Sequence, residues 1–303
     1  MTKEGRSELS PSFFNLENAY LLIGIIYIIY ILHYAGTLYE VRSKVGIPFL
    51  SLSIILLALN SMRAKRGTFS LKGRANTLAS LMFVILAAAT AIYFWLEYFN
   101  ITYYRSGAGN IVDVIFGYII MVLVIETTRK DTGIWIPVIT LAFLLYGYFG
   151  PYFPGVLKHP GFSLWRLSEV SAAQIFTGIY GLLNEIALTW IAIFVVFAGF
   201  VRGFGGADLI LKASALVAKK MKYGVPQTAV VGSMLFGMFS GSAPANVAGT
   251  GVFTIPLMKK YGIPPKFAGA VESVASSGGQ IMPPVMGAGA FIMASFLGTT
   301  YLH

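Results

Sequence analysis

The sequence predicts an all-α integral membrane protein, built of multispanning helices plus a re-entrant helical hairpin and a discontinuous transmembrane helix. Three observations carry this prediction. The 303 residues are 56% hydrophobic and 11% charged, and the mean hydropathy is +0.74, a balance typical of chains that cross a bilayer repeatedly. Apolar runs recur along the chain, and two polar stretches rich in Gly, Ser and Pro interrupt such runs near its end.

The apolar runs predict six spans, each close to the roughly 20 residues that a bilayer requires or somewhat shorter. The first is interpreted as a retained span because no small-residue cleavage pattern follows it. The predicted spans are Tyr20–Tyr34, Val45–Leu59, Leu78–Phe99, Ile111–Ile125, Ile134–Phe149 and Ile186–Phe200.

Basic residues predict the orientation of these spans. Three loops are rich in Lys and Arg, and cytoplasmic loops collect such residues. Counting spans back from these loops places the N-terminus in the cytoplasm and leaves 150–183 outside, where 172–183 is expected to lie along the membrane interface. The net charge of +10 therefore needs no nucleic-acid partner. The basic loops contain Arg63, Lys65, Arg66, Lys72 and Arg74, then Arg129 and Lys130, then Arg202, Lys212, Lys219, Lys220 and Lys222.

The segment from Pro226 to Pro256 predicts a hairpin that enters and leaves the membrane on the same side. A Ser-Gly-Ser-Ala-Pro stretch divides it into arms of about 12 to 15 residues, which are too short to span. Lysines flank both ends, so both ends are expected to face the cytoplasm. Gly241 is suited to end the first arm, and Pro244 to the first turn of the second.

The next segment, from Pro264 to Leu297, predicts a transmembrane helix in two halves. Ser276-Ser277-Gly278-Gly279-Gln280 and Pro283-Pro284 interrupt its apolar run. Backbone that is not helical persists at membrane depth only where protein or a wet cavity covers it. Helix C-termini present carbonyl groups to a cation, whereas helix N-termini present N–H groups to an anion. The two breaks together therefore suit the transport of a cation with an anion.

Candidate cation ligands are the polar residues at the two breaks. Close packing of small residues between helices is the alternative explanation of the same pattern. Glu272 lies four residues before the second break, where it either tunes a cation site, pairs with a lysine or has a structural role. The candidate cation-binding residues are Ser240, Gly241, Ser242, Asn246, Ser276 and Ser277.

The segments 237–262 (GMFSGSAPANVAGTGVFTIPLMKKYG) and 267–287 (FAGAVESVASSGGQIMPPVMG) resemble the large membrane subunit of tripartite ATP-independent periplasmic (TRAP) transporters. The sequence GGQIMPPVMGA at residues 278–288 is most similar to fused permeases of the TAXI branch. The resemblance implies sodium-driven, elevator-type import of organic acids delivered by a periplasmic substrate-binding protein, in a bacterial or archaeal inner membrane. It implies no enzyme activity and no organic cofactor, only co-transported sodium.

The resemblance also assigns residues and domains. It implies that Ser240–Ser242 form the hairpin tip beside one sodium site and that 276–279 belong to the unwound helix. We assign substrate binding to this helix and its flank, namely Gly278, Gly279, Gln280, Pro283 and Pro284. Residues 1–130 are expected to correspond to the small subunit, a scaffold, and residues 131–303 to the first repeat of the large subunit.

The resemblance covers only the first of the two inverted repeats expected in a large subunit. The missing second repeat is therefore expected as the rest of the chain or as a second polypeptide. A truncated or non-transporting scaffold protein is the alternative function. An intramembrane enzyme is disfavoured, because the chain has no cysteine and its three histidines, His33, His159 and His303, lie far apart in the sequence.

Overall fold

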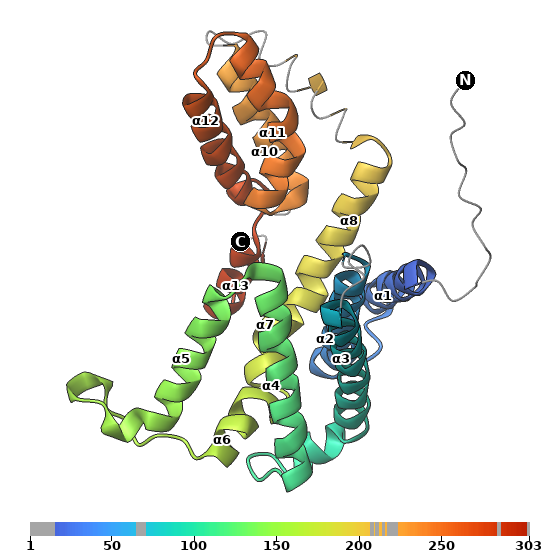
Figure 1. The fold of residues 1–303 in the computed structure, drawn as a ribbon, viewed down its shortest axis with the longest axis vertical. Helices are drawn as coiled ribbons and strands as arrows, with labels where there is room; N and C mark the ends of the chain where they lie inside the picture. The colour runs from blue at the N-terminus through green and yellow to red at the C-terminus, as the bar shows by residue number, and fades with distance from the viewer. Residues whose placement is uncertain are drawn as a thin grey trace. The chain divides into compact units, whose positions relative to one another are not determined.

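The computed structural model describes residues 16–64, 71–206, 209, 212–213, 216, 224–283 and 286–301 (Figure 1). The chain forms two compact units, Met1–Glu185 and Ile186–His303. All described elements are helical, and six described helical segments are long and apolar enough to cross a membrane. The protein is thus an all-α, multispanning membrane protein, as the sequence predicts.

The first unit is built from five long helices whose neighbours in sequence pack together. The first, second and fourth of these helices extend beyond their predicted spans, because hydropathy marks only the apolar centre of a helix while polar residues complete its end turns. The third begins earlier than predicted but ends at Leu96 instead of Phe99, and the fifth begins at Trp135 instead of Ile134. Lys65 and Arg66 lie outside the described residues, as do Lys219, Lys220 and Lys222. The helices are α1 (Leu16–Thr37), α2 (Arg42–Ala64), α3 (Leu71–Leu96), α4 (Ile111–Thr132) and α5 (Trp135–Phe149).

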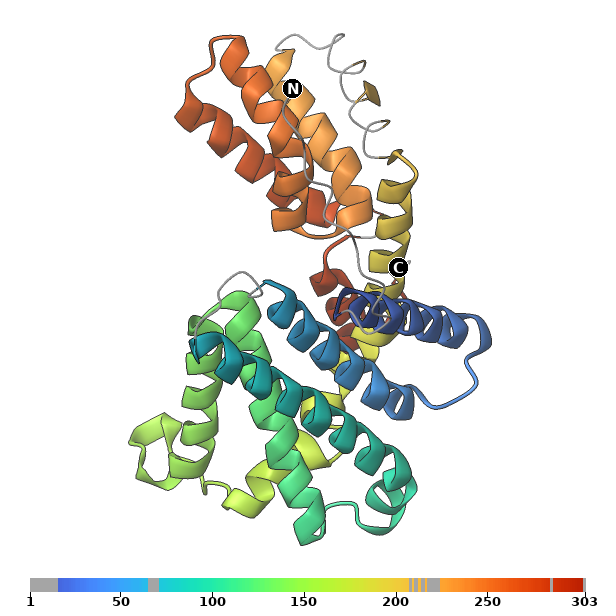
Figure 2. The same ribbon diagram turned by 45° about the vertical axis from the view of Figure 1, so that its right-hand side comes forward.

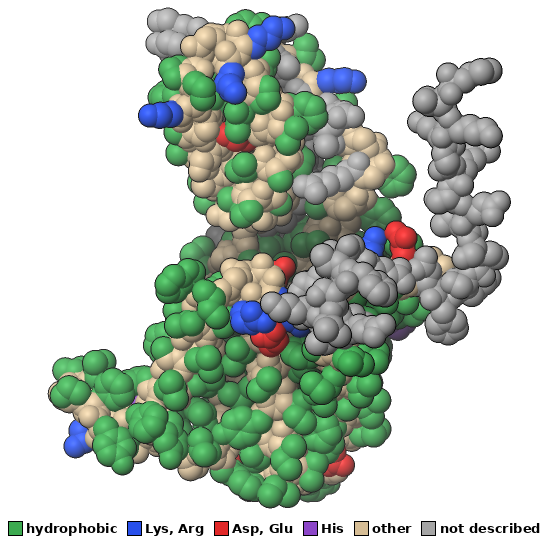
Figure 3. Space-filling view, viewed as in Figure 1, with side chains coloured by type: hydrophobic (Ala, Val, Ile, Leu, Met, Phe, Trp, Pro, Cys, Tyr) green, Lys and Arg blue, Asp and Glu red, His purple; other side chains and the backbone are tan. Residues whose placement is uncertain are grey.

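Apolar side chains both fill the core of this unit and cover its outside. Phe94, Tyr98 and Ile120 belong to one buried cluster between the helices. Leu22 is nevertheless 60% exposed and Phe143 is 70% exposed, and Figure 3 shows hydrophobic side chains over most of this unit's visible face. Proteins in water rarely expose so large an apolar surface, whereas such a surface is favourable in contact with lipid. The exposed surface therefore supports the membrane assignment.

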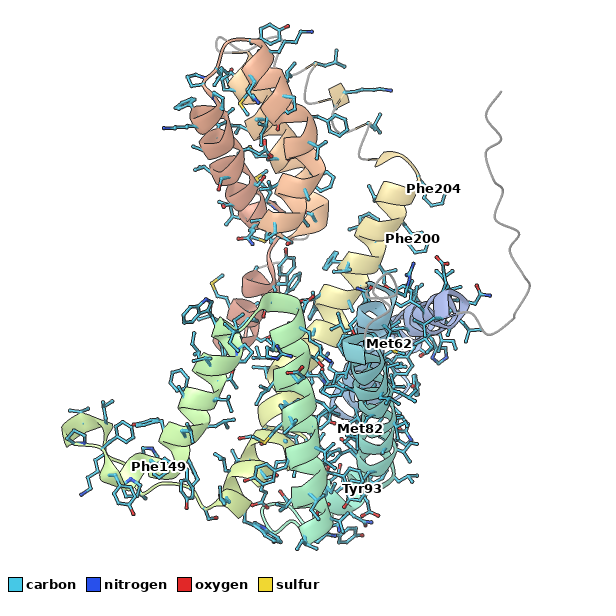
Figure 4. All side chains as sticks on the ribbon, in the orientation of Figure 1. Met62, Met82, Tyr93, Phe149, Phe200 and Phe204 are labelled. Atoms are coloured by element: carbon cyan, nitrogen blue, oxygen red, sulfur yellow. The ribbon has the colours of Figure 1, made fainter. Side chains whose placement is uncertain are left out.

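Polar interactions close the turn between α3 and α4. Asn110 and Asp113 form a reciprocal capping box at the start of α4. Tyr93, labelled on α3 in Figure 4, stacks on Phe116 with ring centroids 4.3 Å apart. Its hydroxyl donates to the Asp113 carboxylate over 2.6 Å. Arg105 forms ion pairs with Glu97 and Asp113. The end of this helical pair is therefore fixed by contacts that do not depend on lipid.

Short helices follow α5 and lead into the second unit. They are η2 (Gly150–Tyr152), η3 (Gly155–Leu157), α6 (Leu164–Ser168), η4 (Glu169–Ala173), η5 (Gly178–Tyr180) and α7 (Leu182–Ile186). The predicted interfacial stretch 172–183 is therefore not one helix. Gly178 explains the interruption, because its φ of +57° brings its Cα to the Ser171 backbone, where an added Cβ would lie 2.0 Å from the carbonyl oxygen.

The second unit contains η6 (Ala187–Ile191), α8 (Ala192–Gly203), α10 (Val225–Ser240), α11 (Ala243–Lys260), α12 (Pro265–Gly278), η7 (Gly279–Ile281) and α13 (Ala288–Leu297). Helices α10, α11 and α12 lie side by side in both ribbon views and contact one another (Figure 2). The division between the two units falls at 185/186. The predicted boundary at 130/131 is a different one, because it divides the part that corresponds to the small subunit from the part that corresponds to the large subunit. It stays a prediction.

Candidate functional site

The hairpin turns at Gly241, as predicted. Helix α10 ends at Ser240, and Gly241 adopts the left-handed conformation with φ 58°, which glycine reaches without steric cost. Helix α11 begins at Ala243 with Pro244 in its first turn, where the missing N–H leaves no hydrogen bond unmade. Ser242 precedes α11 with no side-chain capping bond, and the buried Ser240 hydroxyl has no hydrogen-bond partner among the described residues.

The second break is also present, but it begins later than the sequence predicted. Ser276, Ser277 and Gly278 continue helix α12, and η7 follows from Gly279 to Ile281. The two serines do not interrupt the helix because their hydroxyls are used within it. Ser277 donates to the Ser273 carbonyl over 2.9 Å, and Ser276 donates to the Glu272 carboxylate over 3.1 Å. The prediction that 276–278 are unwound was therefore wrong.

Two glycines allow the first hairpin arm to touch the break. A Cβ placed on Gly237 would lie 2.4 Å from the Gly279 Cα. A Cβ on Gly279 would lie 2.5 Å from the Asn246 amide nitrogen and 3.0 Å from the Ser233 carbonyl oxygen. Neither position has room for a side chain. The backbones of α10 and η7 therefore meet directly at this point.

Behind this contact lies a cluster of buried polar side chains around Glu272. The Glu272 side chain is fully buried and accepts hydrogen bonds from hydroxyls of all three helices. Thr250 and Thr254 of α11 each donate over 2.5 Å. Ser233 of α10 and Ser276 of α12 each donate over 3.1 Å. Unpaired polar groups in an apolar interior are costly, so these bonds tie α10, α11 and α12 together.

Asn246 connects this cluster to the hairpin tip. Its amide group donates to the Ser233 carbonyl over 2.8 Å and to the Ser276 carbonyl over 3.4 Å. The backbone carbonyl of Asn246 can accept from the Thr250 hydroxyl at 2.9 Å. Asn246 lies one helical turn after Ser242, so it joins the turn of the hairpin to the last turn of α12.

The structure therefore separates the predicted cation-binding residues into two groups. It places Asn246 and Ser276 together in the buried cluster, and Ser240, Gly241 and Ser242 at the hairpin tip. Ser277 is exposed on the outside of α12. Of the predicted substrate-binding residues, Gly279 is buried against α10, whereas Gln280 and Pro283 are exposed. Gly278 ends α12, and Pro284 lies outside the described residues.

Three residues of the cluster, Ser233, Thr250 and Thr254, were not predicted from the sequence. One signal could have revealed two of them. Asn246, Thr250 and Thr254 follow at intervals of four residues, which places polar groups on one face of α11. Glu272 and Ser276 have the same spacing on α12. A polar stripe of this kind inside apolar helices predicts buried partners on neighbouring helices.

A broken helix beside buried polar groups is a feature found at the binding sites of many secondary transporters. Comparison with known proteins agrees with this class. The model of the family "Tripartite ATP-independent periplasmic transporter, DctM component" matches residues 119–303. Since this is more than half of the chain, the protein belongs to this family of transporter permeases, which are not enzymes. No solved structure gives a significant match.

Curated relatives are similar over part of their length. The C4-dicarboxylate TRAP transporter large permease protein DctM of Vibrio cholerae is 29% identical over 41% of this chain and 27% of that protein. Its counterpart in Rhodobacter capsulatus is 26% identical over 38% of this chain and 26% of that protein. The isethionate TRAP transporter permease protein DctMQ of Oleidesulfovibrio alaskensis is 30% identical over 46% of this chain and 23% of that protein. The chain thus spans about a quarter of the length of each of these relatives.

Proposed function

We propose that this chain is a membrane permease component of a sodium-driven secondary transporter that imports organic acids. The observation that carries the proposal is the direct contact of the hairpin with the helix break, beside a buried polar cluster in a chain of the DctM family. Helix ends at such breaks present backbone carbonyl and N–H groups to ions and anionic substrates. The names of the relatives specify C4-dicarboxylates and isethionate, which are organic anions.

The proposed sodium site uses the ends of the hairpin arms and the last turn of α12. Ser240, Gly241 and Ser242 would supply oxygens at the tip, where the Ser240 hydroxyl has no partner among the described residues. Asn246 and Ser276 lie one turn away from the tip and the break. Gly278 to Gln280 and the prolines after them would bind the carboxylate of the substrate, and the hairpin would move with it in an elevator-type cycle.

The proposal includes partners and a place in the cell. A periplasmic binding protein would deliver the substrate, and a second repeat, in the same polypeptide or another, would complete the site. We also propose that the chain is a fused permease of the TAXI branch, in a bacterial or archaeal inner membrane with its N-terminus in the cytoplasm. The basic loops of the sequence support this orientation.

Sodium-dependent uptake tests the proposal. The complete transporter, reconstituted with its binding protein, should take up a carboxylate in sodium chloride and not in choline chloride. Ser242→Leu and Gly241→Val should each abolish the sodium response. The first removes a tip oxygen, and the second places a branched side chain at φ 58°, a conformation that it strongly disfavours. A sodium response that survives both changes would place the cation site elsewhere.

A further inference from the structure

Glu272 is a buried acid in a part of the chain that is otherwise basic. The acidic residues of 186–303 are Asp208, which lies outside the described residues, and Glu272. Helix α10 contains no charged residue, and the lysines of α11 and α12, Lys259, Lys260 and Lys266, are exposed at the helix ends. Among the described residues no ion pair involves Glu272. Its partners on every packed helix are hydroxyl groups.

Hydroxyl groups satisfy the hydrogen bonds of a carboxylate but do not neutralise its charge. A buried charge without an opposite charge is costly, and buried charges in proteins are paired or bind a cation. No described residue therefore supplies a positive charge that would balance the Glu272 carboxylate. The place where a cation is expected, at the hairpin tip and the end of α12, lies about one to two helical turns away.

We propose that Glu272 supplies the negative charge that balances the co-transported monovalent cation, as a positioning residue and not as a ligand. The inference rests on the proposed function. Thr250 and Thr254 lie 2.5 Å from the carboxylate oxygens, so an ion between these oxygens would have to push them apart. The charge acts instead across the Ser276 hydroxyl, which contacts the carboxylate, and across Asn246, which contacts the Ser276 carbonyl.

The expected size of the effect follows from the helix geometry. With a rise of about 1.5 Å per residue, Glu272 lies about 9 Å along the axis from Gly278 at the end of α12. At that distance and an effective dielectric constant of about 20, the attraction between unit charges corresponds to about a twentyfold change in affinity. Removing the charge without removing the side chain should therefore weaken cation binding about twentyfold.

The test compares Glu272→Gln with the wild-type complete transporter. Thermal stabilisation is measured over a sodium chloride titration, with choline chloride keeping the ionic strength constant. Glutamine retains the shape and can donate to hydroxyls that turn to accept. We expect its half-saturating sodium concentration to rise about twentyfold, with a similar melting temperature in choline chloride. Ser273→Ala, at an exposed position on α12, is the matched control and should behave as wild type.

A second pair keeps the test decisive if Glu272→Gln fails to fold. Glu272→Asp and Glu272→Asn have nearly the same shape and differ in charge, so the aspartate variant should bind sodium about twentyfold more tightly. Equal sodium affinity of Glu272→Gln and wild type, or of the Asp and Asn variants, would overturn the inference and leave sodium coupling intact. A wild-type transporter that does not respond to sodium would overturn the proposed function and this inference together.

Discussion

The contact between Gly237 and Gly279 makes Gly279→Ala a sharp test of how the hairpin meets the helix break. The added Cβ would lie 2.5 Å from the Asn246 amide nitrogen, 3.0 Å from the Ser233 carbonyl oxygen and 3.1 Å from the Gly237 Cα. Two of these atoms are backbone, so α10 itself must move. Overpacking of this kind costs about 1–3 kcal/mol. Displacing the Asn246 amide from the Ser233 carbonyl, 2.8 Å away, costs about 1 kcal/mol more.

The neighbouring glycine supplies the control. A Cβ on Gly278 would meet nothing within 4 Å, and its φ of −61° suits alanine. Gly278→Ala should therefore stabilise the folded protein by about 0.4–1 kcal/mol, because alanine lowers the conformational entropy of the unfolded chain. Gly279→Ala, which gains the same contribution, should remain about 1–3 kcal/mol less stable than wild type. Denaturant titration of the two variants in one detergent measures the difference. Equal stability of the two would refute the direct backbone contact.

Two further predictions concern topology and completeness. Cysteines introduced one at a time at Lys222 and Lys260 should both react with an impermeant thiol reagent from the cytoplasmic side. A cysteine at Leu157 should react from outside. Labelling of 222 and 260 from opposite sides would exclude a re-entrant hairpin. Residues 1–303 alone in proteoliposomes should show no saturable sodium-dependent transport, and co-expression with the complementary repeat should restore it, since polar backbone at the two breaks needs a protein surface to cover it. Robust transport by these residues alone would contradict the predicted repeat architecture.

The fold could be predicted from the sequence where a single residue determines the local backbone conformation. Gly241 and Pro244 mark the hairpin turn because each permits a backbone geometry that other residues disfavour. Apolar runs located the long helices, although their ends were missed by several residues. The second break was placed too early, because the serines before it are as compatible with a helix as with a break once Ser273 and Glu272 accept their hydrogen bonds.

The polar cluster was harder to predict because its contacts join three helices. Nothing next to Glu272 in the sequence shows that Ser233 and Thr254 will contact it, since 39 and 18 residues separate them from it. A threonine in an apolar helix also fits close helix packing, the alternative explanation considered for this region. Only the packing of α10, α11 and α12 distinguishes the two explanations, and that packing depends on tertiary structure.

The hydroxyls of Thr250 and Thr254 in α11 can form hydrogen bonds within the hairpin as well as with Glu272. Each hydroxyl has a second acceptor within its own arm, the Asn246 backbone carbonyl at 2.9 Å for Thr250 and the Thr250 backbone carbonyl at 3.0 Å for Thr254. If α12 withdrew, both hydroxyls could turn to these carbonyls and stay hydrogen-bonded. The carboxylate of Glu272 has no such substitute on its own helix beyond Ser276. The threonine hydroxyls would therefore keep a hydrogen bond within the hairpin, whereas the Glu272 carboxylate would keep only the bond from Ser276.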